Sequence, residues 1–348
     1  MITVLENMQD GVCEDGIRRA GEILRAGGLV AFPTETVYGL GANALDADAS
    51  AKIYRAKGRP SDNPLIVHIA DWEAIGRITE ALPPQAGLLS EAFWPGPLTM
   101  VLRKSREVPY ATTGGLDTVA VRMPDNMIAR ALIRAGGGYV AAPSANTSGR
   151  PSPTTAQHVA EDMDGVIDMI IDGGPVAIGL ESTIIDLTGE TPVILRPGFI
   201  SQEMLRQVVG AVEVDRGLLS DDPSVHPKAP GMKYRHYAPK APLFIVEGGR
   251  QPVMEKINAL AASEYEAGRL VGVIAADETV GCYEHAVVKS IGSRGRELTI
   301  AQHLYAILRE FDLLKVSVIY SESFETPQMG PAIMNRLMKA AGHQVIHV

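Results

Sequence analysis

The segment between Lys57 and Asn63 carries residue types that bind polyanions. Within seven residues it offers two cations, a hydroxyl and an amide, on Lys57, Arg59, Ser61 and Asn63. A glycine and adjacent prolines stiffen the segment, so its donors would leave the loop in fixed directions. An arginine grips a phosphate or carboxylate through two parallel, charge-assisted hydrogen bonds, each worth about 1.5 to 3 kcal/mol when shielded from water. The segment predicts an anion-binding loop, with a solvated surface loop as the alternative.

Two more polar loops follow predicted buried strands. Pro33–Thr36 follows the apolar run Leu29–Phe32, and Pro143–Ser152, which is rich in small hydroxyl residues, follows Tyr139–Ala142. Ligands of open α/β sheets bind where loops meet at the ends of strands. We therefore expect these two loops and the Lys57–Asn63 loop to contribute to a ligand site, with Ser144 facing the Lys57–Asn63 loop across a ligand.

Two arginines lie in apolar surroundings. Arg122 lies within a predicted strand, and Arg196 ends another. A buried arginine needs an anion, either from a ligand or from the protein. Arg122 is predicted to bind a substrate anion, and a structural ion pair with Glu35 or Glu181 stays open.

Signatures of other nucleotide and hydrolase sites are missing or weak. The sequence contains no Gly-x-x-x-x-Gly-Lys-Ser/Thr and no Gly-x-Ser-x-Gly, which excludes a P-loop and a nucleophile elbow. Residues 39–44 match the degenerate dinucleotide pattern, with Asp62 about twenty residues on, but the polar residues 33–36 separate them from the predicted strand. Ser144 and Ser182 have no histidine at informative spacing. Nucleophilic catalysis is not supported.

No bound metal is predicted. Cys13 and Cys282 are far apart and match no zinc-ligand spacing. His343 and His347 could share a face of a strand, although terminal histidines are more often packing or surface residues. His68, at the end of an apolar strand, is either a core residue or a ligand-binding one.

Composition sets the class of the protein. The 348 residues include 46% apolar and 21% charged residues, with a formal net charge of -9. This length favours two domains, and the acidic balance disfavours strong autonomous binding of nucleic acid. Neither an N-terminal signal segment nor an apolar run of membrane-spanning length occurs, so we expect a soluble cytoplasmic protein without membrane contact.

Alternating helices and strands predict an α/β catalytic domain over residues 1–209. Apolar residues at helical spacing predict helices at 15–25, 48–57, 126–135 and 202–209, with two more between 70 and 93. Apolar or alternating runs predict strands at 29–32, 65–69, 98–103, 118–123, 139–142, 166–171, 182–187 and 193–196. Several successive strands lack a helix between them, which indicates a mixed sheet.

Residues 210–240 predict an ordered linker that serves as a lid, and a second domain follows. Near its end Tyr234 and Tyr237 flank His236 and could cover a base ring. Residues 241–348 alternate predicted strands with helices: strands 243–246, 270–275, 316–320 and 345–348, and helices 253–267, 300–314 and 331–341. This pattern is typical of a small, Rossmann-like, doubly wound domain.

Eight motifs in the first domain occur in a characteristic order: Pro33–Leu40, Lys57–Pro60, Asn63–Leu65, Trp94–Thr99, Val121–Pro124, Ala142–Asn146, Glu181–Thr183 and Leu195–Gly198. In order and spacing they resemble the YrdC-type threonylcarbamoyl-AMP synthases. Residues 233–239 and 332–337 resemble the long, two-domain form of that family. One departure is Met329-Gly330-Pro331, where a further glycine is expected. The resemblance implies a YrdC-like mixed twisted sheet with flanking helices, followed by the Rossmann-like domain.

The resemblance implies a nucleotidyltransferase reaction. L-threonine, bicarbonate or carbon dioxide, and ATP would give L-threonylcarbamoyladenylate and pyrophosphate, for N6-threonylcarbamoyladenosine modification of tRNA beside the anticodon. A carbamate formed on the threonine amine would attack the α-phosphorus, so positioning and electrostatics would dominate catalysis. Mg²⁺ would be carried by the ATP phosphates and water.

The resemblance also implies roles for individual residues. L-threonine would be bound by Thr36, His68, Arg122, Ala142 and Ser182. ATP would be bound by Arg59, Asn63, Thr118, Ser144, Ser152, Arg196 and His236. Thr34, Asn146 and Tyr234 are possible additions, and the catalytic charges would come from Lys57, Arg59 and Arg122.

Two other functions are alternatives. The hydrogenase-maturation carbamoyltransferases contain a related domain, but their paired Cys-x-x-Cys motifs cannot occur in a chain with two cysteines. A double-stranded RNA or tRNA-binding module without catalysis stays open, as do weak tRNA binding and transient contact with the tRNA threonylcarbamoyl transferase machinery.

Overall fold

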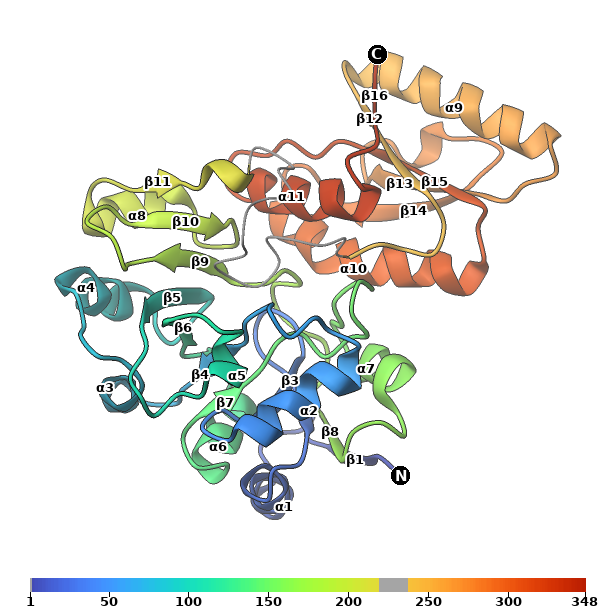
Figure 1. Cartoon of the computed structure of the whole chain (residues 1–348). Coiled ribbons are helices and arrows are strands. Elements are labelled where there is room, and N and C mark those ends of the chain that lie inside the picture. Colours follow the sequence, from blue (N-terminus) through green and yellow to red (C-terminus); the bar gives the residue numbers. More distant parts are fainter. Residues whose placement is uncertain (1, 219–236) are drawn as a thin grey trace. The chain divides into compact units, whose positions relative to one another are not determined.

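The computed structural model describes residues 2–218 and 237–348 (Figure 1). The chain divides into two compact units. Unit 1 comprises Met1–Ser148, Ser152–Ala177 and Glu181–Tyr234, and unit 2 comprises Gly149–Pro151, Ile178–Leu180 and Arg235–Val348.

Unit 1 is built on an eleven-stranded sheet. Its strands are β1 (Val4–Asn7), β2 (Val30–Phe32), β3 (Gly39–Asn43), β4 (Ile66–His68), β5 (Leu98–Arg103), β6 (Thr118–Arg122), β7 (Val140–Ala141), β8 (Met169–Asp172), β9 (Thr183–Asp186), β10 (Val193–Arg196) and β11 (Glu213–Val214). Their order across the sheet is β1-β8-β2-β3-β7-β4-β6-β5-β9-β10-β11. The sheet contains parallel pairs, such as β4 with β6, and antiparallel pairs, such as β4 with β7. The prediction of a mixed sheet is confirmed.

The helices of unit 1 lie on both faces of this sheet (Figure 1). They are α1 (Glu14–Arg25), α2 (Ala47–Lys57), α3 (Ile75–Ile78), α4 (Pro84–Phe93), α5 (Tyr110–Thr113), α6 (Met127–Ala135), α7 (Ala156–Met163) and α8 (Gln202–Val209), with short 3-10 turns η1 (Trp72–Ala74) and η2 (Arg216–Leu218). α2, α3, α4, α7 and α8 contribute side chains to one large core, and α1 and α6 contribute to another.

Alternation along the central strands separates the two faces. Val67 of β4 and Val121 of β6 point into the large core. Their neighbours Ile66 and Ala120 point to the other face, where they join a small apolar cluster with β5, β9 and β10 that contains no helix residue.

Strand β3 was not predicted. Two glycines in five residues weaken the signal of a strand. A Cβ atom at Gly41 would lie 2.9 Å from side-chain atoms of both Phe32 and Val140, so the strand needs glycine at this position. Because residues 39–43 form a strand antiparallel to β2, they are not the tight turn between strand and helix that a dinucleotide site requires.

Unit 2 contains a five-stranded parallel sheet. Its strands are β12 (Leu243–Glu247), β13 (Val271–Ala276), β14 (Val287–Gly292), β15 (Val318–Glu322) and β16 (Val345–His347), in the order β14-β13-β15-β12-β16. Its helices are α9 (Arg250–Glu266), α10 (Glu297–Leu314) and α11 (Gly330–Ala341), with the 3-10 turn η3 (Val280–Cys282). α9 packs on the face that carries Val271 and Val273, whereas Gly272 between them lies against Phe311 of α10. Helices on both faces of a parallel sheet confirm the predicted doubly wound domain.

Among the described residues, no helix is both long enough and apolar enough to cross a membrane.

Candidate active site

Lys57 links the end of α2 to the loop after β7. Gly58 ends the helix with a left-handed backbone at φ 61°, and Lys57 itself is 1% exposed. Its ammonium donates to the carbonyl oxygen of Ser144 at 2.5 Å and to that of Asn146, whose Oδ1 is 3.4 Å away. An ammonium has three donors and no acceptor, so carbonyl oxygens suit it well. The predicted catalytic lysine therefore ties two predicted nucleotide-binding loops together.

Arg59 and Asn63 continue the same loop. Arg59 is half-buried and donates from Nε to the carbonyl of Asn63 at 3.2 Å and from Nη2 to that of Pro64 at 3.0 Å. Asn63 is buried, and its Oδ1 has no hydrogen-bond partner among the described residues. The loop thus presents a backbone-held guanidinium beside an open amide oxygen.

Ser144, Asn146 and Ser152 are ordered by hydrogen bonds within unit 1. Ser144 Oγ donates to Asn146 Oδ1 at 2.5 Å, and the Asn146 amide donates to the carbonyl of Thr147 at 2.8 Å. Ser152 is fully buried and donates to Glu181 Oε1 at 2.6 Å. The loop is therefore joined to Lys57 near its start and to Glu181 at its end.

The direction of the strands explains why these loops meet. β4 and β7 are antiparallel, so the loop that enters β4 and the loop that leaves β7 lie at the same edge of the sheet. Thr118 begins β6, which is parallel to β4, and therefore lies at this edge as well. The mixed sheet thus gathers most of the predicted nucleotide-binding residues along one edge.

His68 and Arg122 lie side by side at the other end of β4 and β6. Arg122 is 4% exposed, and its Nη2 lies 2.7 Å from Glu35 Oε1. Its Nε donates to the carbonyl of Gly96 at 3.4 Å. The sequence had offered Glu35 and Glu181 as structural ion-pair partners of Arg122, and the carboxylate in contact with it is that of Glu35.

His68 is buried and neutral. Its Nδ1 lies 3.1 Å from the carbonyl oxygen of Ile66, and because a carbonyl only accepts, Nδ1 carries the hydrogen. The ring packs edge-on against Phe32. Burial, together with the positive charge of Arg122, lowers the pKa of His68 to about 3. His68 can therefore bind a ligand as a neutral imidazole but cannot supply positive charge near neutral pH.

Thr34 and Thr36 form the turn between β2 and β3. Thr34 Oγ1 donates to the carbonyl of Val37 at 2.7 Å and lies 2.9 Å from Thr36 Oγ1. A hydroxyl has one hydrogen, so Thr36 must donate to Thr34. The Thr36 oxygen can then only accept from a ligand.

Ser182 lies at the start of β9 between two hydrogen-bonding partners. Its hydroxyl is 2.8 Å from Thr99 Oγ1, and Arg196 Nη2 donates to it at 3.2 Å while Arg196 Nε donates to its carbonyl at 3.1 Å. A Cβ at Gly198 would lie 2.4 Å from the backbone nitrogen of Thr183, so only glycine lets the turn after Arg196 approach β9. A predicted threonine-binding residue and a predicted nucleotide-binding residue are thus in direct contact.

The predicted residues form two linked groups. One contains Lys57, Arg59, Asn63, Thr118, Ser144, Asn146 and Ser152, and the other contains Thr34, Thr36, His68, Arg122, Ser182 and Arg196. The Ser152–Glu181 hydrogen bond joins them, and the backbone of Ala142, bonded to the Ile66 carbonyl at 2.8 Å, lies between them at β7. His236 and Tyr234 lie outside the described residues.

Three contributors were not among the predicted site residues: Glu35, Thr99 and Glu181. Each lies inside or beside a motif that was recognised, in the Pro33–Leu40, Trp94–Thr99 and Glu181–Thr183 segments. Two carboxyl groups, Glu35 and Glu181, each next to a predicted ligand-binding residue (Thr36 and Ser182), were the available signal. Without the order of the strands their partners could not be chosen.

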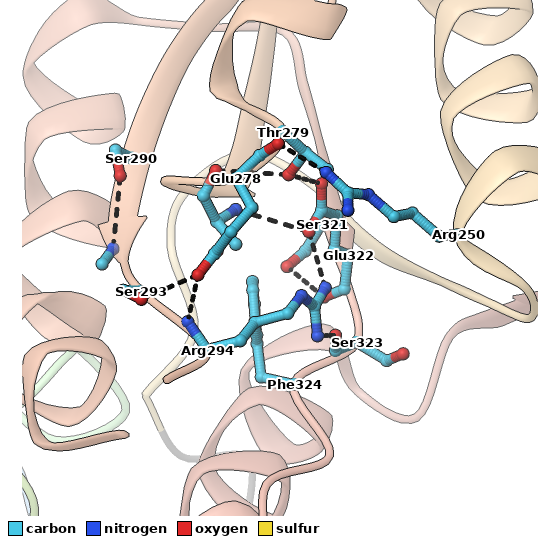
Figure 2. Close-up of polar contacts among 12 residues, drawn as sticks. Arg250, Glu278, Thr279, Ser290, Ser293, Arg294, Ser321, Glu322, Ser323 and Phe324 are labelled. Carbon is cyan, nitrogen blue, oxygen red and sulfur yellow. Dashed lines mark hydrogen bonds and ion pairs between the residues drawn. The ribbon is translucent and has the colours of Figure 1, made fainter. Parts of the chain in front are cut away.

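A second polar cluster lies in unit 2, at the carboxyl ends of β13 and β15 (Figure 2). Buried Glu322 accepts hydrogen bonds from Tyr283 at 2.6 Å, from Arg294 at 2.7 Å, from the Ala276 backbone N–H at 3.3 Å and from the hydroxyl of Thr279. Burial and the nearby Glu322 carboxylate raise the pKa of Tyr283. Doubly wound folds bind ligands at this edge, and here four donors of the protein already satisfy the central carboxylate.

Residues 2–218 and 237–348 contain no group of three or more His, Cys, Asp and Glu side chains that could bind a metal ion.

Comparisons with known proteins agree along the whole chain. A family model described as "Telomere recombination" matches residues 22–198, and one described as "Threonylcarbamoyl-AMP synthase, C-terminal domain" matches residues 200–342. The chain is 52% identical over 331 residues to a threonylcarbamoyl-AMP synthase of Bacillus subtilis, covering 95% of this chain and 94% of that relative. It is 50% identical over 347 residues to one of Pyrococcus abyssi, covering 100% of both. The solved structure of P. abyssi Sua5 complexed with L-threonine superposes with a TM-score of 0.94 at 49% identity, covering 99% of this chain and 100% of that one.

Proposed function

Because the chain belongs to the threonylcarbamoyl-AMP synthase family, a family of nucleotidyltransferases, we propose that it makes L-threonylcarbamoyladenylate. The substrates are L-threonine, bicarbonate or carbon dioxide, and ATP, and the second product is pyrophosphate. One observation carries the proposal: two groups of cationic and hydroxyl side chains lie along one sheet and are joined through the Ser152–Glu181 hydrogen bond. A reaction between two anionic substrates needs two such groups.

The group around Arg122 suits the amino acid. A buried guanidinium binds a carboxylate in a two-pronged geometry. Burial, together with the positive charge of Arg122, lowers the pKa of the neighbouring His68 and keeps it neutral. Neutral His68 and the accepting oxygen of Thr36 suit the polar side chain and the amine of L-threonine. In support, the P. abyssi relative was solved with L-threonine bound.

The group around the Lys57–Asn63 loop suits the nucleotide. Arg59 offers its guanidinium to phosphate oxygens, and the open Oδ1 of Asn63 can accept a hydrogen bond from a base or sugar. Lys57 acts on the nucleotide through the loop that it anchors, since its ammonium is engaged by Ser144 and Asn146. Arg196 belongs to the other group, where it donates to Ser182, and its guanidinium suits the α-phosphate.

The proposed chemistry consists of two steps. The threonine amine condenses with bicarbonate to give a carbamate and water. A carbamate oxygen then attacks the α-phosphorus of ATP, the bond to the bridging oxygen of the β-phosphate breaks, and pyrophosphate leaves. The protein's part is to align the two anions and to neutralise charge on the phosphoryl oxygens. We propose that Mg²⁺ enters with ATP, bound to phosphate oxygens and water.

The adenylate is an activated carbamoyl donor. We propose that it serves the N6-threonylcarbamoyladenosine modification of tRNA beside the anticodon, which would place the reaction in the cytoplasm. Transient contact with the transferase machinery that consumes it, and weak contact with tRNA, would shorten the path of a hydrolysable product.

The experiment supplies purified protein with L-threonine, bicarbonate, Mg²⁺ and ATP. We expect pyrophosphate release that depends on threonine, together with an adenylate that carries label from ¹⁴C-bicarbonate. L-serine and D-threonine serve as matched amino acid controls. Pyrophosphate release that is indifferent to threonine would refute the proposed function.

A further inference from the structure

The carboxylate of Glu35 is buried, and neither of its oxygens accepts a hydrogen bond from the described residues. The residue is 8% exposed, and its Oε1 lies 2.7 Å from Nη2 of Arg122. The N–H bonds of Arg122 do not point along this contact. Consequently Glu35 Oε1, Glu35 Oε2 and Arg122 Nη2 make no hydrogen bond of good geometry with the described residues. The two charges neutralise each other, but the directional bonds are missing.

Such an arrangement is costly for an ion pair with only a structural role. Buried carboxylates normally accept several hydrogen bonds, and burying one without donors forfeits the hydration that it had in water. Replacing a buried ion pair by apolar residues is often neutral or stabilising. In the same protein Glu322 shows the satisfied alternative, with four donors around one carboxylate. The donors that Glu35 lacks can instead come from a ligand.

The surroundings of Glu35 fit one kind of donor. Thr36, the next residue of the turn, donates its only hydroxyl hydrogen to Thr34, so its oxygen can only accept. Arg122 is a donor without acceptors. A ligand that binds the side chains of Glu35, Thr36 and Arg122 together needs a hydrogen-bond donor for Glu35 and Thr36 and an anionic group for Arg122. An α-amino acid carries an ammonium and a carboxylate on the same carbon atom.

We propose that Glu35 binds the α-amino group of the substrate while Arg122 binds its α-carboxylate. This inference rests on the proposed function and adds to it the group that recognises the amine. The Glu35–Arg122 pair then forms a template of opposite charges for a zwitterion. Glu35 is a specificity-determining residue, because it favours amino acids over hydroxy acids of the same shape.

The test compares two ligands by isothermal titration calorimetry in the absence of ATP. They are L-threonine and (2S,3R)-2,3-dihydroxybutanoate, in which a hydroxyl replaces the amine. Wild-type protein is expected to bind L-threonine at least about tenfold more tightly than the hydroxy acid, the ratio expected for one charge-assisted hydrogen bond. Glu35→Gln is expected to weaken L-threonine by about 10- to 100-fold, to change the hydroxy acid little, and so to bring the ratio close to one.

Two control variants test whether a loss of affinity in Glu35→Gln comes from misfolding. Glu35→Asp keeps the charge on a shorter side chain and should retain part of the preference for the amine. Glu91→Gln removes an exposed carboxylate of α4 and should bind both ligands as the wild type does. Thermal unfolding of each variant shows that it is folded at the titration temperature.

Three results would overturn the inference. Tighter binding of L-threonine by Glu35→Gln would mean that Glu35 competes with the substrate carboxylate for Arg122. An equal loss of affinity for both ligands would mean that Glu35 supports the structure of the site without binding the amine. Wild-type protein that binds neither compound would overturn the proposed function as well, which distinguishes that failure from the first two.

Discussion

The ammonium of Lys57 lies 2.5 Å from the carbonyl oxygen of Ser144, although 87 positions separate the two residues. The contact exists because α2 ends just before β4 and the Ser144 loop leaves β7, which is antiparallel to β4. One buried charge therefore fixes the distance between two loops proposed to bind ATP. Loss of this charge should affect nucleotide binding even though Lys57 need not touch the nucleotide.

Lys57→Met is expected to lower stability and to raise the KM for ATP. Removing the ammonium leaves buried carbonyl oxygens of Ser144 and Asn146 without their donor, at a cost of about 1 to 3 kcal/mol, or roughly 2 to 12 °C in Tm. The matched control is Lys52→Met on the same helix, where the lysine donates to the carbonyl of Gly27 at 2.6 Å. The control should lower Tm and leave the KM for ATP unchanged. Equal effects on KM would contradict the loop-anchoring role.

Arg59→Ala and Arg122→Ala are expected to separate the two substrates. Arg59→Ala should raise the KM for ATP with little effect on L-threonine, and Arg122→Ala should do the reverse, each by about tenfold or more. Arg122→Ala also leaves the carboxylate of Glu35 buried without its ion-pair partner, so this variant should lose stability. A double variant, Arg122→Ala with Glu35→Ala, should recover stability but not threonine affinity. Steady-state kinetics with each substrate varied in turn, plus thermal unfolding, measure both effects; equal losses for both substrates would refute the division.

Most of the helices and strands, though not the short α5, β1 and β11, could be predicted because their signals are local. α1 has apolar residues at helical spacing and an acidic first turn, and β5 is a nearly continuous apolar run. β3 and β14 escaped prediction for local reasons too: β3 contains two glycines, and β14 contains Lys289 and Ser290 among its apolar residues. The prediction also missed α7, which directly follows a loop of small polar residues.

From the sequence the candidate site could be proposed as a set of residues but not as a set of contacts. Motifs pointed to Arg122, Ser182 and Arg196 as candidates, because each lies in a short, recognisable segment. That Arg196 donates to Ser182, or that Arg122 meets Glu35, depends on which strands are neighbours and in which direction they run. Such pairings join residues far apart in the chain, and one sequence contains no signal that selects among them.

Glu322→Gln is expected to destabilise unit 2 and to spare the chemistry. The change removes the negative charge opposite Arg294 (Figure 2). It also reduces the capacity of residue 322 to accept the hydrogen bonds that Tyr283 and Thr279 now donate. Breaking one side of a buried pair costs about 3 to 5 kcal/mol, less here because Arg294 is partly exposed. Thermal unfolding should show an early transition, while the KM values measured at 25 °C stay at wild-type levels. Unchanged unfolding would show that the network contributes nothing to stability.

His68 is expected to make the stability of the protein depend on pH in mildly acidic solution. Its pKa is about 3 in the folded protein, against about 6.5 in an unfolded chain. Between pH 6.5 and pH 3 the His68 imidazole is protonated in the unfolded chain but neutral in the folded protein. The free energy of unfolding therefore falls as the pH falls from 6.5 towards 3, and it is independent of this group above pH 6.5.

The comparison with His68→Asn isolates this effect. Asparagine does not titrate, and its amide can donate to the Ile66 carbonyl as Nδ1 of the imidazole does. Between pH 8 and pH 5 the wild type should lose about 2 kcal/mol more free energy of unfolding than His68→Asn, measured by urea denaturation at each pH. The ring signals of His68 in NMR spectra should show no titration between pH 5 and pH 8. A ring titration with a midpoint near 6.5, or parallel stability curves for the two proteins, would show that the imidazole takes up a proton in the folded state.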